Sequence, residues 1–163
     1  MSGSSIYSQN SLSSVPPEDR GSGPGAVFRL GLESRHWIEG RARESYPHEG
    51  CGLLVGSSEP GPQVEYATAA RNLAHDRLTD RYRLDPEDFL AVDAQAREDG
   101  HEILGIWHSH PDHPAKPSPT DRAQAWPGYT YVIVEVREGA VRDLTAWHLE
   151  GDRFVQQDIQ EDI

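Results

Sequence analysis

The chain has 163 residues, of which 36% are hydrophobic and 26% are charged, and its formal net charge is −12. This length suits one domain with its own hydrophobic core. The acidic balance argues against DNA or RNA as a main partner, because proteins that bind nucleic acids usually carry a basic surface. No stretch approaches the ~20 apolar residues of a membrane span, so we expect no membrane partner.

The single cysteine, Cys51, excludes an internal disulfide and a zinc finger built from cysteines. We expect a small buried thiol at this position rather than a nucleophile. A chain that is poor in cysteine and shows no signal peptide is predicted to be cytoplasmic. Any metal site must therefore be built from histidine and carboxylate side chains. The sequence gives no indication of the oligomeric state.

The composition divides the chain into three predicted parts. Residues 1–25 are rich in serine, glycine and proline, so we predict a disordered N-terminal tail. Residues 26–157 are predicted to form a single α/β domain. Residues 158–163 are predicted to be a C-terminal tail, and the acidic end of the chain is expected to fray after Phe154 and Val155.

The first half of the domain contains alternating strand and helix patterns. Residues 26–32 alternate like a strand, and 33–45 are predicted to form a helix because Pro47 lies just beyond their end. Short apolar or β-branched runs predict further strands. These predicted strands lie at 52–56, 63–70 and 81–84.

The second half begins with a well-marked helix. Asp85 can cap its N-terminus, Pro86 occupies its first position, and Gly100 ends it. Residues 103–108 then form a predicted buried strand, and 129–136 are apolar enough for a central strand. The turn at 137–139 leads into a hairpin partner at 141–149.

The strand at 103–108 runs directly into His108-Ser109-His110-Pro111. Side chains two residues apart in an extended chain share a face, so His108 and His110 are predicted to point the same way. Pro111 keeps the preceding residue extended. Two imidazoles on one face at the end of a strand form a pair of candidate metal ligands.

A catalytic zinc ion takes three protein ligands and one water molecule. Asp121 is the candidate third ligand because it follows a short proline-rich loop. Ser118 and Pro119 predict a helix start that places Asp121 in the first turn. Ser118 and Asp121 can also be read simply as a helix cap, and the two roles are compatible. His113 lies close enough in sequence to contact a substrate.

Hydrolysis of an amide also needs a proton acceptor that does not bind the metal. Glu49 is a candidate for this general acid/base because it precedes an apolar strand among small residues. The residue chemistry alone does not separate Glu49 from Glu44 or Glu102.

The spacing of these residues resembles the signature of the JAMM (MPN-domain) metalloproteases. That signature is an upstream Glu, then His-x-His-Pro, six residues, Ser, two residues and Asp. His108, His110, Pro111, Ser118 and Asp121 fill every fixed position, and the stretch from Glu49 to Leu54 matches the bacterial form of the upstream part.

The resemblance implies a fold, a site and an activity. The implied fold is a mixed β-sheet sandwiched by helices, like the cytidine deaminase core. His108, His110 and Asp121 would bind one zinc ion, Glu49 would shuttle the proton, and Ser118 would support the tetrahedral intermediate. Family members cleave peptide or isopeptide bonds after the C-terminal Gly-Gly tail of ubiquitin-like proteins. Short bacterial members often act with sulfur-carrier proteins of that fold, so such a carrier is the expected substrate.

Other functions remain open at this stage. A non-catalytic MPN scaffold and a zinc peptidase for unrelated small peptides are the two alternatives. The run from His108 to Asp112 and His113 also matches the His-x-His-x-Asp-His motif of metallo-β-lactamase-like hydrolases. Those enzymes need further metal ligands downstream, whereas His148 is the only histidine after His113.

Overall fold

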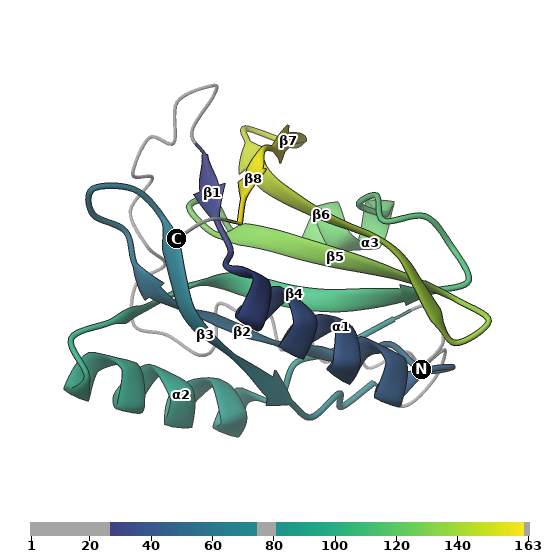
Figure 1. The fold of residues 1–163 in the computed structure, drawn as a ribbon, viewed down its shortest axis with the longest axis horizontal. Helices are drawn as coiled ribbons and strands as arrows, with labels where there is room; N and C mark the ends of the chain where they lie inside the picture. Colours follow the sequence, from purple (N-terminus) through teal and green to yellow (C-terminus); the bar gives the residue numbers. More distant parts are fainter. Residues whose placement is uncertain (1–26, 75–80, 162–163) are drawn as a thin grey trace, which may run out of the picture.

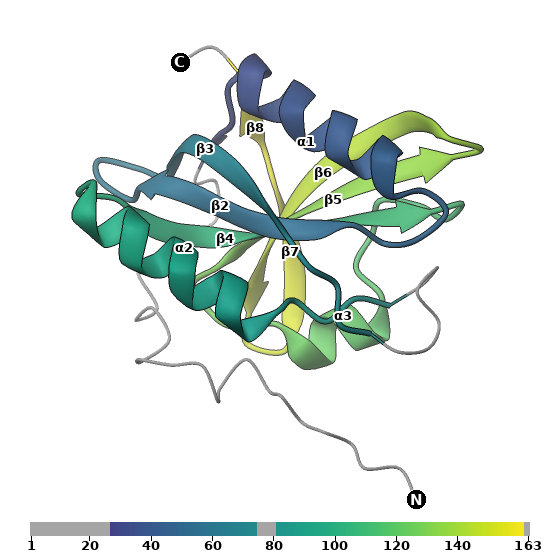
Figure 2. The same cartoon turned by 90° about the horizontal axis from the view of Figure 1, so that it is seen from below.

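The computed structural model describes residues 27–74 and 81–161, so the tail predicted at 1–25 lies outside the described residues. Within this part, eight strands form one mixed sheet with helices on both faces (Figures 1 and 2). In chain order the elements are β1 (Phe28–Arg29), α1 (Leu32–Ser45), β2 (Cys51–Ser57), β3 (Gln63–Ala70), α2 (Pro86–Glu98), β4 (Glu102–Pro111), α3 (Pro119–Gln124), β5 (Thr130–Arg137), β6 (Ala140–Glu150), β7 (Arg153–Gln157) and β8 (Ile159–Gln160).

The strand order in the sheet is β7-β6-β5-β4-β2-β3-β1-β8. Neighbouring strands are antiparallel except for three parallel pairs, which are β4–β5, β1–β3 and β1–β8. The central strands β2 and β4 are almost completely buried, because helices cover both of their faces.

Each face of the sheet has its own hydrophobic core. On one face, Ile38 and Ala42 of α1 pack in a cluster with Trp107 and Val132. On the other face, α2 contributes Phe89 to a second cluster. Figure 2 shows α1 on one side of the sheet and α2 with α3 on the other. This arrangement confirms the predicted α/β class, in which helices sandwich a mixed sheet.

Local sequence signals predicted the limits of several helices and turns correctly. The Asp85 side chain caps α2 by accepting a hydrogen bond of 2.9 Å from the backbone N–H of Glu87, and Pro86 is the first helical residue. Gly100 follows this helix with a φ of 76°, a conformation that glycine adopts easily. The hairpin between β5 and β6 turns at Glu138 and Gly139, which both have positive φ.

The strand predicted at 81–84 is wrong. Among the described residues of this segment, only Leu84 forms a β-bridge, and its partner is Asn72. The Asn72 side chain occupies the backbone groups that a strand would use. It accepts from the N–H of Arg83 at 2.8 Å and donates to the carbonyl of Arg81 at 3.2 Å. Backbone bonds from the Leu73 N–H to Arg83 and from the Asp85 N–H to Arg71 accompany these contacts, so the side chain takes the place of part of a neighbouring strand.

The expected fraying after Phe154 and Val155 is also wrong. Strand β7 continues to Gln157, and Ile159–Gln160 form β8 where a tail was expected. Strand β1 offers an open edge, and Phe28 donates a hydrogen bond of 3.0 Å to the carbonyl of Asp158. Ile159 packs against the core on the α1 face. The other limits of the predicted domain stay predictions.

No helix in the described part of the chain is long and apolar enough to cross a membrane.

Gly52 lies where the backbone of β2 passes closest to its neighbours. The indole N–H of Trp107 donates to the carbonyl of Thr68 at 2.8 Å. A Cβ on Gly52 would lie 1.7 Å from that carbonyl oxygen and 2.4 Å from the indole nitrogen. Only glycine leaves room for this hydrogen bond, which ties β4 to β3 across β2.

We expect Gly52→Ala to lower the free energy of unfolding by roughly 1–3 kcal/mol, because overpacking a filled site displaces backbone. Urea unfolding followed by circular dichroism measures the change. Gly61→Ala is the matched control, since a Cβ there meets nothing within 4 Å. Equal stability of the two variants would contradict the close approach at Gly52.

Candidate metal centre

Antiparallel pairing of β2 with β4 assembles the candidate site. Cys51 lies opposite His108 in this pairing, so Glu49 is carried to the C-terminal end of β4. His108 and His110 lie on the same face of β4, as predicted, with their ring centroids 5.0 Å apart. Both histidines are buried, with at most 1% of their surface exposed.

The ring of His110 is oriented by the loop that follows it. Its Nδ1 lies 2.7 Å from the carbonyl oxygen of Pro114. A carbonyl can only accept, so Nδ1 carries a proton, and in the neutral ring Nε2 then carries a lone pair. This Nε2 lies 3.1 Å from Oδ2 of Asp121. A lone pair and a carboxylate oxygen at this distance need a cation or a proton between them.

His108 lies between two carboxylates. Its Nδ1 is 3.2 Å from Oε1 of Glu49, and its Nε2 is 3.9 Å from Oδ1 of Asp121. Burial alone would lower the pKa of His108, but Asp121 and Glu49 together raise it. Its Nε2 is buried and has no hydrogen-bond partner among the described residues. A buried nitrogen of this kind is a candidate metal ligand.

Asp121 is fixed by the first turn of α3. Ser118 and Asp121 form a capping box, in which the Ser118 hydroxyl accepts from the Asp121 N–H at 3.0 Å. The Ser118 N–H in turn donates to Oδ2 of Asp121 at 2.9 Å. Burial would raise the pKa of Asp121, but His108, His110 and Ser118 hold it well below its usual range. The carboxylate is therefore ionised.

Glu49 completes the group of candidate ligands. It is 3% exposed, and its Oε2 has no hydrogen-bond partner within the described residues. Ligand atoms of Glu49, His108 and His110 all lie within 4.8 Å of one another. The two imidazole nitrogens and the two carboxylates thus fit a divalent cation. Either Glu49 or Asp121 could supply the oxygen ligand.

Two further rings enclose the histidines. Tyr82 stacks on His108 with centroids 4.5 Å apart, and His113 stacks on His110 with centroids 4.1 Å apart. His113 also lies with Nδ1 2.8 Å from the carbonyl of Pro111. Tyr82 could not be predicted as part of the site, because a lone tyrosine in an apparent strand carries no signal of metal binding.

Cys51 and Asp112 lie outside the group of candidate ligands. The Cys51 thiol is buried, and burial together with Glu49 raises its pKa far above the usual range, so it stays protonated. The Asp112 carboxylate accepts from the hydroxyl of Tyr46 at 2.7 Å and from the N–H of Glu138 at 2.9 Å. The metallo-β-lactamase-like motif would need Asp112 as a metal ligand, whereas both of its carboxylate oxygens are engaged in these hydrogen bonds.

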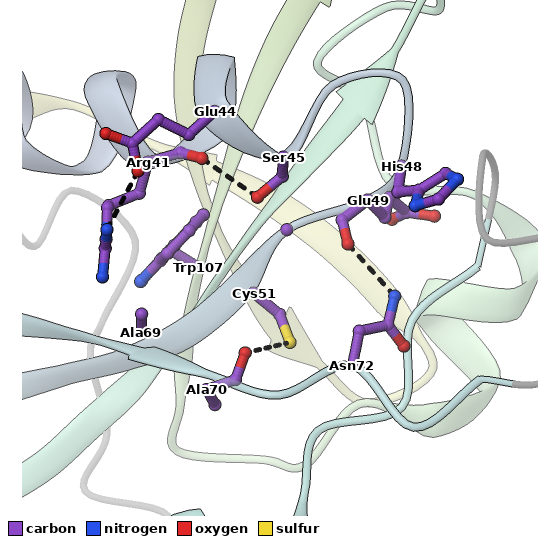
Figure 3. Close-up of a pocket in the computed structure, with 11 residues that line it drawn as sticks. Arg41, Glu44, Ser45, His48, Glu49, Cys51, Ala69, Ala70, Asn72 and Trp107 are labelled. Carbon is purple, nitrogen blue, oxygen red and sulfur yellow. Dashed lines mark hydrogen bonds and ion pairs between the residues drawn. The ribbon is translucent and has the colours of Figure 1, made fainter.

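A cavity of about 350 Å³ lies beside Glu49. Strands β2 and β3, the end of α1 and the indole of Trp107 form its walls (Figure 3). Arg41, Cys51 and Asn72 also contribute side chains to the lining. Of the candidate ligands, Glu49 lines this cavity, whereas His108, His110 and Asp121 do not.

Comparison with known proteins places the chain in a family. Residues 36–150 match the family described as prokaryotic homologs of the JAB domain. Desampylase of Haloferax volcanii is 35% identical over 130 residues, covering 77% of this chain and 89% of that protein. CysO-cysteine peptidase of Mycobacterium tuberculosis is 33% identical over 113 residues, covering 66% and 73% of the two chains.

A solved structure agrees with this placement. The solution structure of a Salinibacter ruber protein is 41% identical to the chain and superposes with a TM-score of 0.64, covering 83% of this chain and 91% of that one. The resemblance to JAMM (MPN-domain) proteins is confirmed, and the chain belongs to the prokaryotic JAB domain family.

Proposed function

We propose that the protein is a zinc-dependent peptidase or isopeptidase that cleaves at the C-terminal Gly-Gly tail of a ubiquitin-like or sulfur-carrier protein. One observation carries the proposal. The Nε2 atoms of two buried histidines, His108 and His110, face the carboxylate of Asp121, and the carboxylate of Glu49 contacts the Nδ1 of His108 within the same cluster.

We assign His108, His110 and Asp121 as the zinc ligands. The two Nε2 atoms and the Asp121 carboxylate face one another, whereas Glu49 contacts the opposite nitrogen of His108. Imidazole and carboxylate ligands without thiolate suit a catalytic zinc site that leaves one position for water. Zinc bound there would polarise the scissile carbonyl and lower the pKa of a bound water to ~7.

Glu49 then acts as the general acid/base. Its Oε1 is engaged by Nδ1 of His108, and its second carboxylate oxygen remains available to accept a proton from the attacking water. The same carboxyl group returns that proton to the leaving amine. Ser118 uses an oxygen lone pair for the helix cap, so its O–H can donate to the developing oxyanion.

The depth of the site favours a narrow substrate segment. The candidate ligands His108 and His110 are almost completely buried, so a bond on a folded surface could not reach them. An extended tail that ends in two glycines suits such a site, because glycine has no side chain that would collide with the walls. The similarity to a desampylase and to a CysO-cysteine peptidase supports this class of substrate.

We expect the purified protein to bind about one zinc per chain and to release the last residue of a Gly-Gly-ending carrier that bears a C-terminal cysteine. Glu49→Gln should keep the zinc, because the amide oxygen can still accept from His108, and should slow cleavage by about 10²–10⁴-fold. Mass spectrometry of the carrier and metal analysis of the protein give the two measurements.

Glu44→Gln is the matched control, because Glu44 is an exposed residue of α1 that pairs only with Arg41 among the described residues. It should cleave at the wild-type rate. Full activity of Glu49→Gln would remove Glu49 from the mechanism. Zinc binding without cleavage of any carrier by the wild-type protein would favour a scaffold, and cleavage of short peptides alone would favour the small-peptide alternative.

The two roles of Ser118 can be separated by substitution. Ser118→Gly should lower stability by only a few tenths of a kcal/mol, because glycine is tolerated at a helix N-cap, whereas Ser118→Ala should cost ~0.5–2 kcal/mol. Both variants should lose about 10²–10³-fold in kcat if the hydroxyl donates to the oxyanion. Thermal unfolding and cleavage kinetics measure these effects, and a wild-type rate for Ser118→Gly would leave Ser118 as a cap only.

A further inference from the structure

The side-chain amide of Asn72, just after β3, makes four hydrogen bonds. Its Nδ2 donates to the carbonyl oxygens of Glu49 at 3.1 Å and Arg81 at 3.2 Å. Its Oδ1 accepts from the backbone N–H groups of Ala74 at 3.0 Å and Arg83 at 2.8 Å. An asparagine side chain has two donors and two acceptor sites, so its capacity is completely used.

These partners fix the orientation of the amide. Rotating it by 180° would place the NH₂ group against two N–H donors and the oxygen against two carbonyls. Figure 3 shows the Asn72 side chain beside the cavity, with its nitrogen directed at the backbone of Glu49. One side chain therefore connects the candidate general base to both arms of the segment between β3 and α2.

The peptide bond after Glu49 is held from its other side as well. The N–H of Gly50 donates to the hydroxyl of Ser109 at 2.8 Å, and the N–H of Ser109 donates to the carbonyl of Gly50 at 3.0 Å. Asn72 binds the carbonyl and Ser109 binds the N–H of the same peptide unit. The unit has little freedom to rotate, which restricts where the Glu49 carboxylate can lie.

Asn72 also holds the chain that carries Tyr82. Its bonds to Arg81 and Arg83 lie directly on either side of this tyrosine, whose ring stacks on His108. His108 is thus contacted on its ring face by Tyr82 and at Nδ1 by Glu49. Both contacts depend on segments that Asn72 anchors.

We propose that Asn72 is a positioning residue of the metal centre, acting through the peptide bond of Glu49 and through Tyr82. The inference rests on the proposed function for its effect on catalysis. Its effect on the metal site can be measured without any substrate, because contacts that orient a metal-binding histidine influence metal affinity.

The Asn72→Asp substitution keeps the acceptor contacts of the side chain and removes its donor contacts. A carboxylate still accepts from Ala74 and Arg83, but it places an oxygen against the carbonyls of Glu49 and Arg81. We expect kcat to fall on the order of 10–100-fold with KM within about twofold, because a small displacement of a reacting group is costly. Zinc affinity, measured by competition with a chromophoric chelator, should fall by about tenfold or more.

Asp88→Ala is the matched control. Asp88 accepts from the N–H of Arg71 at 2.8 Å, so its loss loosens the chain next to Asn72 without removing a contact to Glu49. This variant should keep the wild-type kcat and zinc affinity. Asn72→Ala, which adds no charge, serves as a second variant if Asn72→Asp does not fold, and thermal unfolding monitors both.

In the Glu49→Gln background and at saturating zinc, Asn72→Asp should cause a smaller further loss of rate than in the wild type, because the two changes share their effect on Glu49. Wild-type kcat and zinc affinity in the Asn72 variants, or equal losses in Asp88→Ala, would overturn the positioning role. A wild-type protein that cleaves no carrier would instead refute the proposed function, and the zinc measurement would still decide the role of Asn72.

Discussion

The pairing of β2 with β4 is the constraint on which the candidate site depends. These strands are separated by more than forty residues, and their register places Cys51 opposite His108. Glu49 precedes the first strand and His110 lies near the end of the second, so the carboxylate and the imidazoles meet only when this register forms. A slip of one residue would turn both histidines to the other face of the sheet. The candidate metal centre is therefore a consequence of sheet formation.

Close packing protects this register. The indole of Trp107 reaches across Gly52 to the carbonyl of Thr68, which links the three strands β4, β2 and β3. Trp107 alternates with His108 and so faces the core on the α1 side, while the histidines face the α2 side. One strand thus contributes to the core with one face and to the site with the other.

Short-range signals allowed much of the fold to be predicted. Three of these features depend only on residues a few positions apart. They are the helix that begins after Asp85, the cap formed by Ser118 and the hairpin turn at Gly139. The shared face of His108 and His110 follows from the period of a strand. These features need no knowledge of distant contacts.

The features that could not be predicted from the sequence share one physical origin. The segment at 81–84 has the composition of a strand, but two of its hydrogen bonds go to the side chain of Asn72 and another goes to the backbone of Leu73. The C-terminal residues appear too polar to be ordered, yet the open edge of β1 pairs with β8. Tyr82 contacts His108 by ring stacking, and no fixed sequence spacing between the two residues predicts such a contact. In each case the partner lies far along the chain, and only the folded sheet identifies it.

Asp121 shows how local and long-range structure meet in one side chain. Its carboxylate completes the cap of α3 through Ser118 and also faces Nε2 of His110. The helix has only six residues, so the cap contributes a large share of its stability. A cation held by this carboxylate would therefore stabilise the start of α3, and a well-formed cap would in turn hold the carboxylate in place for the cation. Metal binding and the folding of this short helix should be coupled, because both use the carboxylate of Asp121.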